Sequence, residues 1–322
     1  MSKLLIALFS LSLSTSLLAD TLKPIASDNS LTIGNSTIEL IYNSTFTPQE
    51  KQRLRRWINT TANSITSVYG SFPINKAYIR LHRYVPKQPW ASFASGPAPW
   101  AFVNRGQKPG VTFHVDLAES DEAFIEDWTA YHELSHLLIP YPGDKDLWFS
   151  EGLASYYQNI TRARTGVVSE QVAWQKIYNG LMRGKKDQRM SSLNLAELSP
   201  KMRETRSFMR VYWSGAKYFL LTDYLLRKES DNQQSLDTVL RQFQQCCLEQ
   251  NRDWTGKALA ETFDKLSNTS IFTREYKNAA ESVELNGFDT IFTSLGMTIK
   301  DSKVVLSNNK QALHSKIMSN SL

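Results

Sequence analysis

The chain has 322 residues, of which 41% are hydrophobic and 21% are charged, and this composition excludes a disordered or fibrous protein. Its length suffices for one large domain or for two lobes with a substantial apolar core. The formal net charge is +6, but the basic residues are scattered and their longest cluster, Arg183 to Lys186, is short, so a solvated basic surface is favoured over nucleic-acid binding.

The amino terminus has the pattern of a secretory signal peptide. Lys3 gives a positive start, residues 4–18 are apolar and serine-rich, and Ala19 is a small residue before Asp20. The apolar stretch is too short to span a bilayer comfortably, and no later stretch approaches the roughly 20 apolar residues that a spanning helix needs. We therefore predict a signal peptide over residues 1–19, a periplasmic or secreted protein, and no stable membrane span after cleavage. An uncleaved membrane anchor is the alternative.

The two cysteines of the chain, Cys246 and Cys247, are adjacent in the sequence. A disulfide between neighbours closes a strained ring, and the pair lacks the spacing of a metal site. We predict two free thiols on a helix, with a redox switch as the alternative.

The first half of the chain alternates strand and helix patterns. Alternating, β-branched residues predict one or two strands over 31–42, and the segment Thr47-Pro48-Gln49-Glu50 is a capping box that opens a helix ending near Tyr69. Another strand is predicted over 77–84, and a loop over 85–99.

Two paired strands are predicted next, over 100–104 and 111–115, and Ser120 then caps a helix that runs to about Leu138. From Ser150 onward the pattern is almost wholly helical, with helices near 151–164, 168–183, 208–228, 234–249, 254–266, 271–283 and 288–295.

This distribution predicts an α+β fold. We expect an N-terminal α/β lobe over residues 30–145, with a mixed sheet and the helix that ends near Leu138. An all-helical lobe over 146–306 and a polar tail over 307–322 would follow.

The helix after Ser120 contains the segment His132-Glu133-Leu134-Ser135-His136. Two histidines four residues apart differ by about 40° around a helix, so both imidazoles can face one metal ion. Glu133 then lies beside the metal, where it can take a proton from a zinc-bound water. The segment predicts a catalytic zinc site with His132 and His136 as ligands and Glu133 as general base.

A catalytic zinc ion usually has a third protein ligand. Glu151 is separated from His136 by the 14 residues 137–150, which contain two prolines and a glycine that allow the chain to turn back. Ser150 could cap a helix that Glu151 opens. Asp144 and Asp146, in the intervening loop, remain alternative ligands.

The motif at His132, followed by Trp148-Phe149-Ser150-Glu151-Gly152-Leu153-Ala154-Ser155-Tyr156-Tyr157, closely resembles the gluzincin metallopeptidases, especially the peptidase-MA-like, glycyl-aminopeptidase and aminopeptidase-N groups. The resemblance covers residues 120–160 well and 205–230 more weakly, and it does not extend to the first hundred residues. It implies a zincin-like catalytic domain with Glu151 as the third zinc ligand.

The same resemblance extends to the segment Tyr212-Trp213-Ser214-Gly215, although Ser214 stands where the family often has lysine. It implies that the Tyr212 hydroxyl stabilises the tetrahedral intermediate, with Tyr156 and Tyr157 as rival hydroxyls. It also implies that residues 100–104 form an edge strand that pairs with the substrate backbone.

Three other histidines, His82, His114 and His314, are predicted to be structural or surface residues rather than ligands. Arg206 and Arg210 could contact a substrate carboxylate, although surface arginines beside a helix start are commoner.

These observations predict an exported metallopeptidase with one zinc ion per chain and a peptide or protein substrate. A catalytically inactive zinc-binding interaction module, or a zinc hydrolase acting on other substrates, are the alternatives. Exopeptidase and endopeptidase action stay open. The G-[AG]-M-E-N marker of the aminopeptidase-N group, which grips a free amino terminus, is absent from residues 90–118, which argues against simple aminopeptidase action, but other glutamates could serve.

Overall fold

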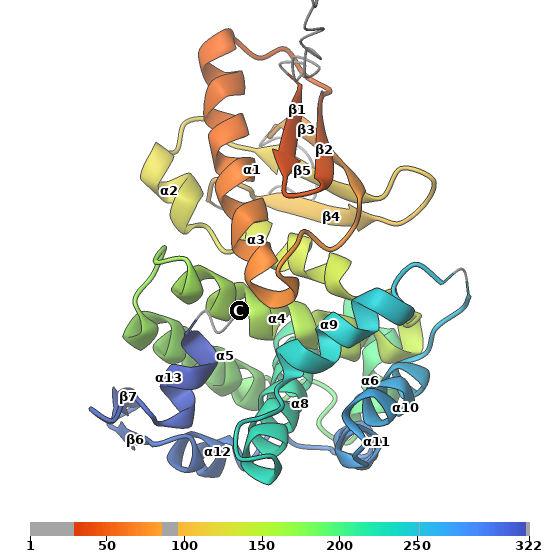
Figure 1. Ribbon diagram of the computed structural model, residues 1–322, viewed down its shortest axis with the longest axis vertical. Coiled ribbons are helices and arrows are strands. Elements are labelled where there is room, and N and C mark those ends of the chain that lie inside the picture. Colours follow the sequence, from red (N-terminus) through yellow and green to blue (C-terminus); the bar gives the residue numbers. More distant parts are fainter. Residues whose placement is uncertain (1–28, 86–95, 251, 320–322) are drawn as a thin grey trace, which may run out of the picture.

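The computed structural model describes residues 29–85, 96–250 and 252–319. The predicted signal peptide and most of the predicted loop over 85–99 lie outside these ranges. Within them, a sheet with its helices forms one part of the molecule and a group of helices forms the other (Figure 1). The division of the chain into separate units, with a boundary at residue 146 and a polar tail over 307–322, stays a prediction.

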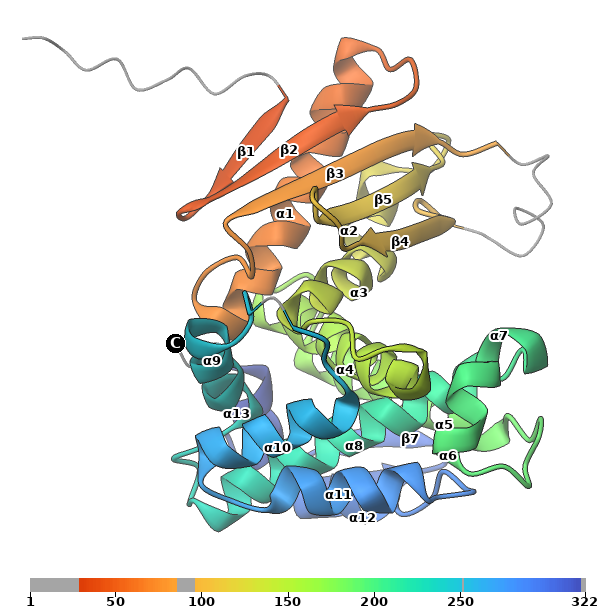
Figure 2. The ribbon, with the colours of Figure 1, turned by 90° about the vertical axis from the view of Figure 1, so that its right-hand side faces the viewer.

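The sheet is mixed, as predicted. Its order is β1-β2-β3-β5-β4; β2, β3 and β5 run parallel, and the two outer strands run antiparallel to their neighbours (Figure 2). β4 is therefore an edge strand. The bounds of the strands are β1 Ser30–Ile33, β2 Ser36–Tyr42, β3 Lys76–Arg83, β4 Trp100–Asn104 and β5 Gly110–Val115.

Helix α1, Pro48–Tyr69, packs against the face of the sheet on which the Phe113 side chain of β5 lies. The rings of its Trp57 and of Phe113 on β5 meet edge to face, with 5.0 Å between their centroids. The predicted capping box is confirmed, because Thr47 accepts a hydrogen bond from the Glu50 backbone and the Glu50 carboxylate accepts one from the Thr47 backbone. Gly70 ends the helix in the left-handed conformation, with φ of 83°.

The single helix predicted from Ser120 to Leu138 is wrong, because the structure breaks it in two. Ser120 caps α2, Asp121–Glu126, as expected, but Asp127 is extended with ψ of 136°. The Asp127 carboxylate then accepts a hydrogen bond from the Thr129 backbone at 2.9 Å, at the start of α3, Thr129–Ser135. A 3₁₀ turn, His136–Leu138, continues α3. A local hydrogen bond from the backbone to the Asp127 side chain, within the apolar pattern, thus accompanies the break.

The predicted long helices of the second half are confirmed. They are α4 Leu147–Arg164, α5 Glu170–Lys186, α8 Phe208–Glu229, α9 Leu236–Cys246, α10 Gly256–Ser267, α11 Ile271–Ala280 and α12 Phe288–Ser294. None of the described helices is both long and apolar enough to cross a membrane.

Several short elements were not predicted. They are two helices, α6 Leu195–Leu198 and α7 Met202–Thr205, a hairpin of β6 Met297–Lys300 and β7 Lys303–Leu306, and a final helix, α13 Leu313–Met318. Helix α13 packs against α4, burying Ile317 and Met318. His314 is also buried, with its Nδ1 2.5 Å from the Glu170 carboxylate, so it is a structural histidine as predicted.

Helices α4 and α8 cross with their backbones in contact. A Cβ added to Gly152 would lie 2.3 Å from the carbonyl carbon of Gly215, and one added to Gly215 would lie 2.0 Å from the carbonyl oxygen of Trp148. Only glycine permits this approach. It brings the residue before Gly152, Glu151, close to the first turns of α8.

The prediction of two free thiols is wrong, because Cys246 and Cys247 form a disulfide. Cys246 is the last residue of α9, and Cys247 lies beyond it with φ of −137° and ψ of −22°. Departure from helical geometry lets the two neighbouring side chains meet instead of pointing about 100° apart.

Candidate metal centre

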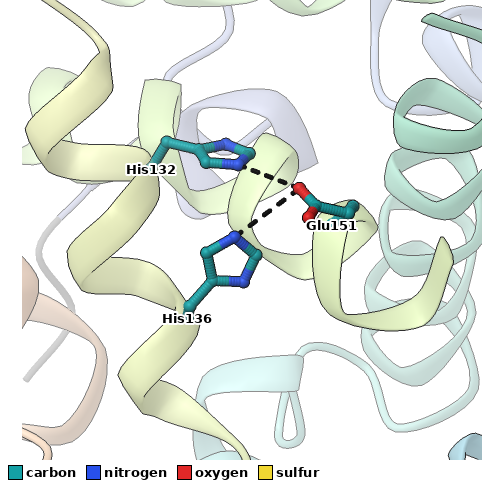
Figure 3. Close-up of side chains that lie close together, drawn as sticks. All are labelled: His132, His136 and Glu151. Carbon is teal, nitrogen blue, oxygen red and sulfur yellow. Dashed lines mark hydrogen bonds and ion pairs between the residues drawn. The ribbon is translucent and has the colours of Figure 1, made fainter. Parts of the chain in front are cut away.

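Three side chains from two packed segments, α3 with the turn that continues it and α4, converge on one point. His132 lies on α3, His136 begins the 3₁₀ turn that follows it, and Glu151 lies on the first turns of α4, which packs against α3. One ligand atom from each lies within 4.8 Å of the others. The Glu151 Oε2 atom is 3.1 Å from the His132 Nε2 atom and 3.5 Å from the His136 Nε2 atom (Figure 3).

Hydrogen bonds on the far side of each ring fix which nitrogen faces inward. The His132 Nδ1 atom is 2.8 Å from the Gln158 side-chain oxygen, and the His136 Nδ1 atom is 3.0 Å from the Ser150 hydroxyl oxygen. Both Nε2 atoms therefore face Glu151. Such partners are typical of metal-bound histidines, because they orient the ring.

Sequence reasoning misassigned Ser150 and missed Gln158. Helix α4 begins at Leu147, so Ser150 does not cap it and contacts His136 instead. Gln158 follows Glu151 by seven residues, which places both on the same face of α4. That spacing was the available signal for Gln158.

The ionisable groups of the site shift one another's pKa values. Burial works against a charge on Glu151, but the neighbouring His136 and His132 outweigh it and hold the pKa of Glu151 well below its usual range. Burial is also the largest influence on Glu133, and it raises the pKa of that carboxyl. For His132, burial is opposed by the hydrogen bond and charge of Glu151, which raise its pKa. Two carboxyl groups thus lie beside two imidazoles in a site largely closed to water.

Arg105 supports the turn that carries His136, a role that no sequence pattern indicated. Its guanidinium donates to the carbonyl oxygens of His136, at 2.7 Å, and Ile139, at 2.9 Å. These carbonyls lie at the end of the helical segment, where they lack partners within it. Burial lowers the pKa of Arg105 to about 10, against the charges of Tyr141, Glu151 and Glu133.

Tyr212, on the second turn of α8, lies against the ligands. Its ring stacks on that of His132, with 5.7 Å between centroids and 16° between planes. Burial, followed by the charges of Glu151 and Glu133, raises the pKa of Tyr212 well above its ordinary value, so the hydroxyl keeps its proton. The rival hydroxyls of Tyr156 and Tyr157 donate instead to Asp223 and Asp237, each at 2.7 Å.

The alternative ligands have other partners. Asp146 accepts hydrogen bonds from the Gly256 backbone, at 2.8 Å, and from the Tyr276 hydroxyl, at 2.5 Å. Asp144 accepts one from the Tyr141 hydroxyl. Neither belongs to the converging group.

The other candidate residues also lie apart from it. His82 and His114 stack on each other across β3 and β5, with 4.9 Å between ring centroids. Arg210 is buried and donates to carbonyl oxygens, among them that of Leu193 at 2.8 Å, so it is structural. Arg206 is exposed just after α7.

The donor set fits zinc. Two imidazole nitrogens and one carboxylate oxygen are the protein ligands of a well-known class of catalytic zinc sites, which leave a fourth position for water or substrate. The inward Nε2 atoms, their fixed rings and the Glu151 carboxylate within 3.5 Å of both are the features that such a site needs.

Comparisons with known proteins find similarities to peptidases. The family model of the M61 glycyl aminopeptidases matches residues 141–218, which include Glu151 and Tyr212. No curated protein matches the chain. Among solved structures, an aminopeptidase N family protein from Idiomarina loihiensis has a TM-score of 0.62 at 14% sequence identity, covering 84% of this chain and 49% of that one.

An M1 zinc metallopeptidase from Deinococcus radiodurans is similar over 80% of this chain and 51% of its own, with 15% identity and a TM-score of 0.47. The chain therefore spans about half the length of these solved structures. The Idiomarina protein establishes the shared α+β fold. By this fold, the matched segment and the His-His-Glu group, the chain resembles the gluzincin-type zinc metallopeptidases, as its motifs predicted.

Proposed function

We propose that the chain is an exported metallopeptidase that hydrolyses peptide bonds with one zinc ion, held by His132, His136 and Glu151. The observation that carries the proposal is the convergence of these three ligand atoms within 4.8 Å, although Glu151 lies on a different helix from the histidines. The similarity to zinc peptidases supports it. Export rests on the sequence of residues 1–19.

A zinc ion in this position would polarise the substrate carbonyl and lower the pKa of water. Glu133 is the proposed general base. It follows a ligand directly, and its raised pKa suits a group that accepts the proton of the attacking water and passes it to the leaving amine. No covalent intermediate with the protein is needed.

Tyr212 is the proposed donor to the developing oxyanion. Its hydroxyl stays protonated, its ring rests on His132, and the two rival hydroxyls are engaged elsewhere. A preorganised donor of this kind stabilises charge that develops in the transition state.

The edge strand β4 is the proposed binding element for the substrate backbone. Its position at the edge of the sheet and its contact with α3 place it beside the ligands. An edge strand offers backbone hydrogen bonds that do not depend on side chains.

Cleavage of a peptide library, mapped by mass spectrometry, tests the proposal. The intact protein loaded with zinc is compared with the Glu133→Gln variant and with protein treated with a chelator. We expect cleavage only by the first, and restoration when zinc is returned to the third. Cleavage that survives either loss contradicts the mechanism. Stoichiometric zinc with no cleavage at all would favour the inactive zinc-binding module.

A further inference from the structure

Exposed aromatic side chains lie on elements that carry or adjoin the candidate metal centre. In the described part of the chain, the exposed large aromatic side chains are Trp100 (45%), Phe102 (44%), Trp128 (48%), Tyr141 (38%) and Phe208 (36%). Single exposed apolar residues are common on any protein, but a cluster of them marks a binding surface.

Two of these side chains extend a row of rings that includes a ligand. The Trp128 ring meets that of His132 at 5.5 Å, and His132 stacks on Tyr212 at 5.7 Å. The Phe208 ring then meets that of Tyr212 at 6.4 Å. The row thus runs from the exposed Trp128, through the ligand His132 and the Tyr212 ring, to the exposed Phe208.

Two more side chains belong to the edge strand. The register pairs Trp100 with His114 and Phe102 with Thr112, so both point to the same face of the sheet. A substrate strand added beside β4 would lie next to these rings. The rings therefore flank the path that the proposed function gives to the substrate backbone.

Tyr141 connects the site to a groove on the His136 side. Its ring lies 5.9 Å from the guanidinium of Arg105, which binds the His136 carbonyl. Both residues line a groove of about 610 Å³, and Asn104, the last residue of β4, lines it as well. Its other walls include the apolar side chains of Ile139, Pro140, Leu248 and Trp254.

We infer that the substrate is an extended polypeptide with apolar, mainly aromatic, side chains near the bond to be cleaved. Trp128 and Phe208 contact it beside His132, and the groove behind Tyr141 receives it beside His136. This inference rests on the proposed function and adds its substrate class. Aromatic side chains provide large apolar contact area at low conformational cost, which suits them to this role.

Binding to an inactive protein separates this inference from the proposed function. Full-length zinc-loaded Glu133→Gln protein is titrated with two fluorescent peptides of equal length and net charge, and anisotropy is measured. One peptide carries Phe and Leu at its central positions, and the other carries Ser and Gly. We expect the apolar peptide to bind at least about tenfold more tightly, the order of discrimination that apolar contacts provide. Equal binding, or no binding of either peptide, overturns the inference.

Variants then locate the preference. In the same background, Trp128→Gln, Phe208→Gln and Tyr141→Ala should each weaken binding of the apolar peptide about five- to tenfold and leave the polar peptide unaffected. Tyr141→Phe keeps the ring and should bind normally. Val305→Gln is the matched control, since Val305 is exposed on the distant β7. A preference that persists in all three variants contradicts the inference, provided zinc content and melting temperature are unchanged.

Library cleavage by the unmodified protein reports on the proposed function separately. Cleavage without apolar preference would contradict the substrate class alone. Selective binding of the apolar peptide without any cleavage would contradict the peptidase alone.

Discussion

Two buried charged clusters lie on opposite sides of α4. On one side, Glu151 and Gln158 face the histidines of α3. On the other side, Tyr156, Tyr157 and Arg164 face α8 and α9. At 100° per residue, these three lie roughly opposite Glu151 around the helix. Both clusters place carboxylates in the interior, yet they are compensated differently.

The second cluster, which we call the closed cluster, contains Asp223, Asp237, Arg164 and Arg227, whose side chains are at most 4% exposed. Asp237 is 2.6 Å from Arg164, and Asp223 is 3.0 Å from Arg227. Each carboxylate also accepts a hydrogen bond from a tyrosine. Two negative charges therefore meet two positive ones.

The metal centre is compensated differently, because the partners of Glu151 are the imidazoles of His132 and His136, which carry a positive charge only when they are protonated. Glu133 and Glu151 supply two carboxyl groups, and the nearby Arg105 directs its hydrogen bonds to carbonyl oxygens instead. Buried charges are stable only when they are paired or coordinate a metal. The comparison shows why one cluster is complete within the protein and why the other has the chemistry of a cation site.

The largest expected effect separates chemistry from metal binding. Glu133→Gln should lower kcat by about 10²- to 10⁴-fold, the usual contribution of a general base. The variant should keep its zinc, because Glu133 is not in the ligand group. Steady-state kinetics with metal analysis checks this, and loss of zinc together with activity would show that Glu133 supports the metal itself.

Breaking the closed cluster should cost stability and leave chemistry intact. Asp237→Ala leaves the buried Arg164 guanidinium without its carboxylate, so the free energy of unfolding should fall by about 3–5 kcal/mol. Urea denaturation measures the change. The zinc affinity and kcat of the folded variant should be unchanged, and a comparable loss of zinc affinity would mean that the two sides of α4 are coupled.

A pair of tyrosine variants sharpens the comparison. Tyr212→Phe should lower kcat about 10²-fold, as expected on loss of an oxyanion donor, with little effect on stability. Tyr156→Phe should lower the free energy of unfolding by about 1.5–3 kcal/mol, because it removes a hydrogen bond to the Asp223 carboxylate. Its kcat should be normal. The reverse pattern would mean that the oxyanion donor is Tyr156, on the other side of α4.

The smallest effect is expected for Gln158, which orients the ligand His132. Gln158→Ala removes the partner of the His132 Nδ1 atom and should weaken zinc binding about 10- to 100-fold. Competition with a chelating dye measures the affinity. Gln171→Ala is a matched control, because that side chain binds the Val304 carbonyl far from the site. Equal effects of the two substitutions would contradict the role of Gln158.

The features predicted from the sequence are those that short spacings determine. The α1 capping box, the alternating strands and the His132–His136 pair each depend on residues a few positions apart. Glu151 was found through a motif that lies on one helix. Gln158 was within reach of the same reasoning, because its spacing from Glu151 is a helical one.

What the sequence did not predict depends on contacts between distant segments. Arg105 follows a strand and meets the carbonyl of His136 only in the folded chain. The segment that forms α13 has the sequence of a polar tail. Its helix is stabilised by the contact of His314 with Glu170 and by the burial of Ile317, which short-range patterns do not reveal. The break at Asp127, where the side chain accepts a hydrogen bond from the Thr129 backbone, lies inside an otherwise continuous apolar pattern and was therefore missed.

Zinc titration of the metal-free, full-length protein tests the central claim most directly. The unmodified chain should take up one equivalent of zinc tightly, and His136→Ala and Glu151→Ala should each bind it at least about 10²-fold more weakly, since each loses a direct ligand. Zinc uptake that is unchanged by both substitutions, or absent from the unmodified chain, would contradict the account.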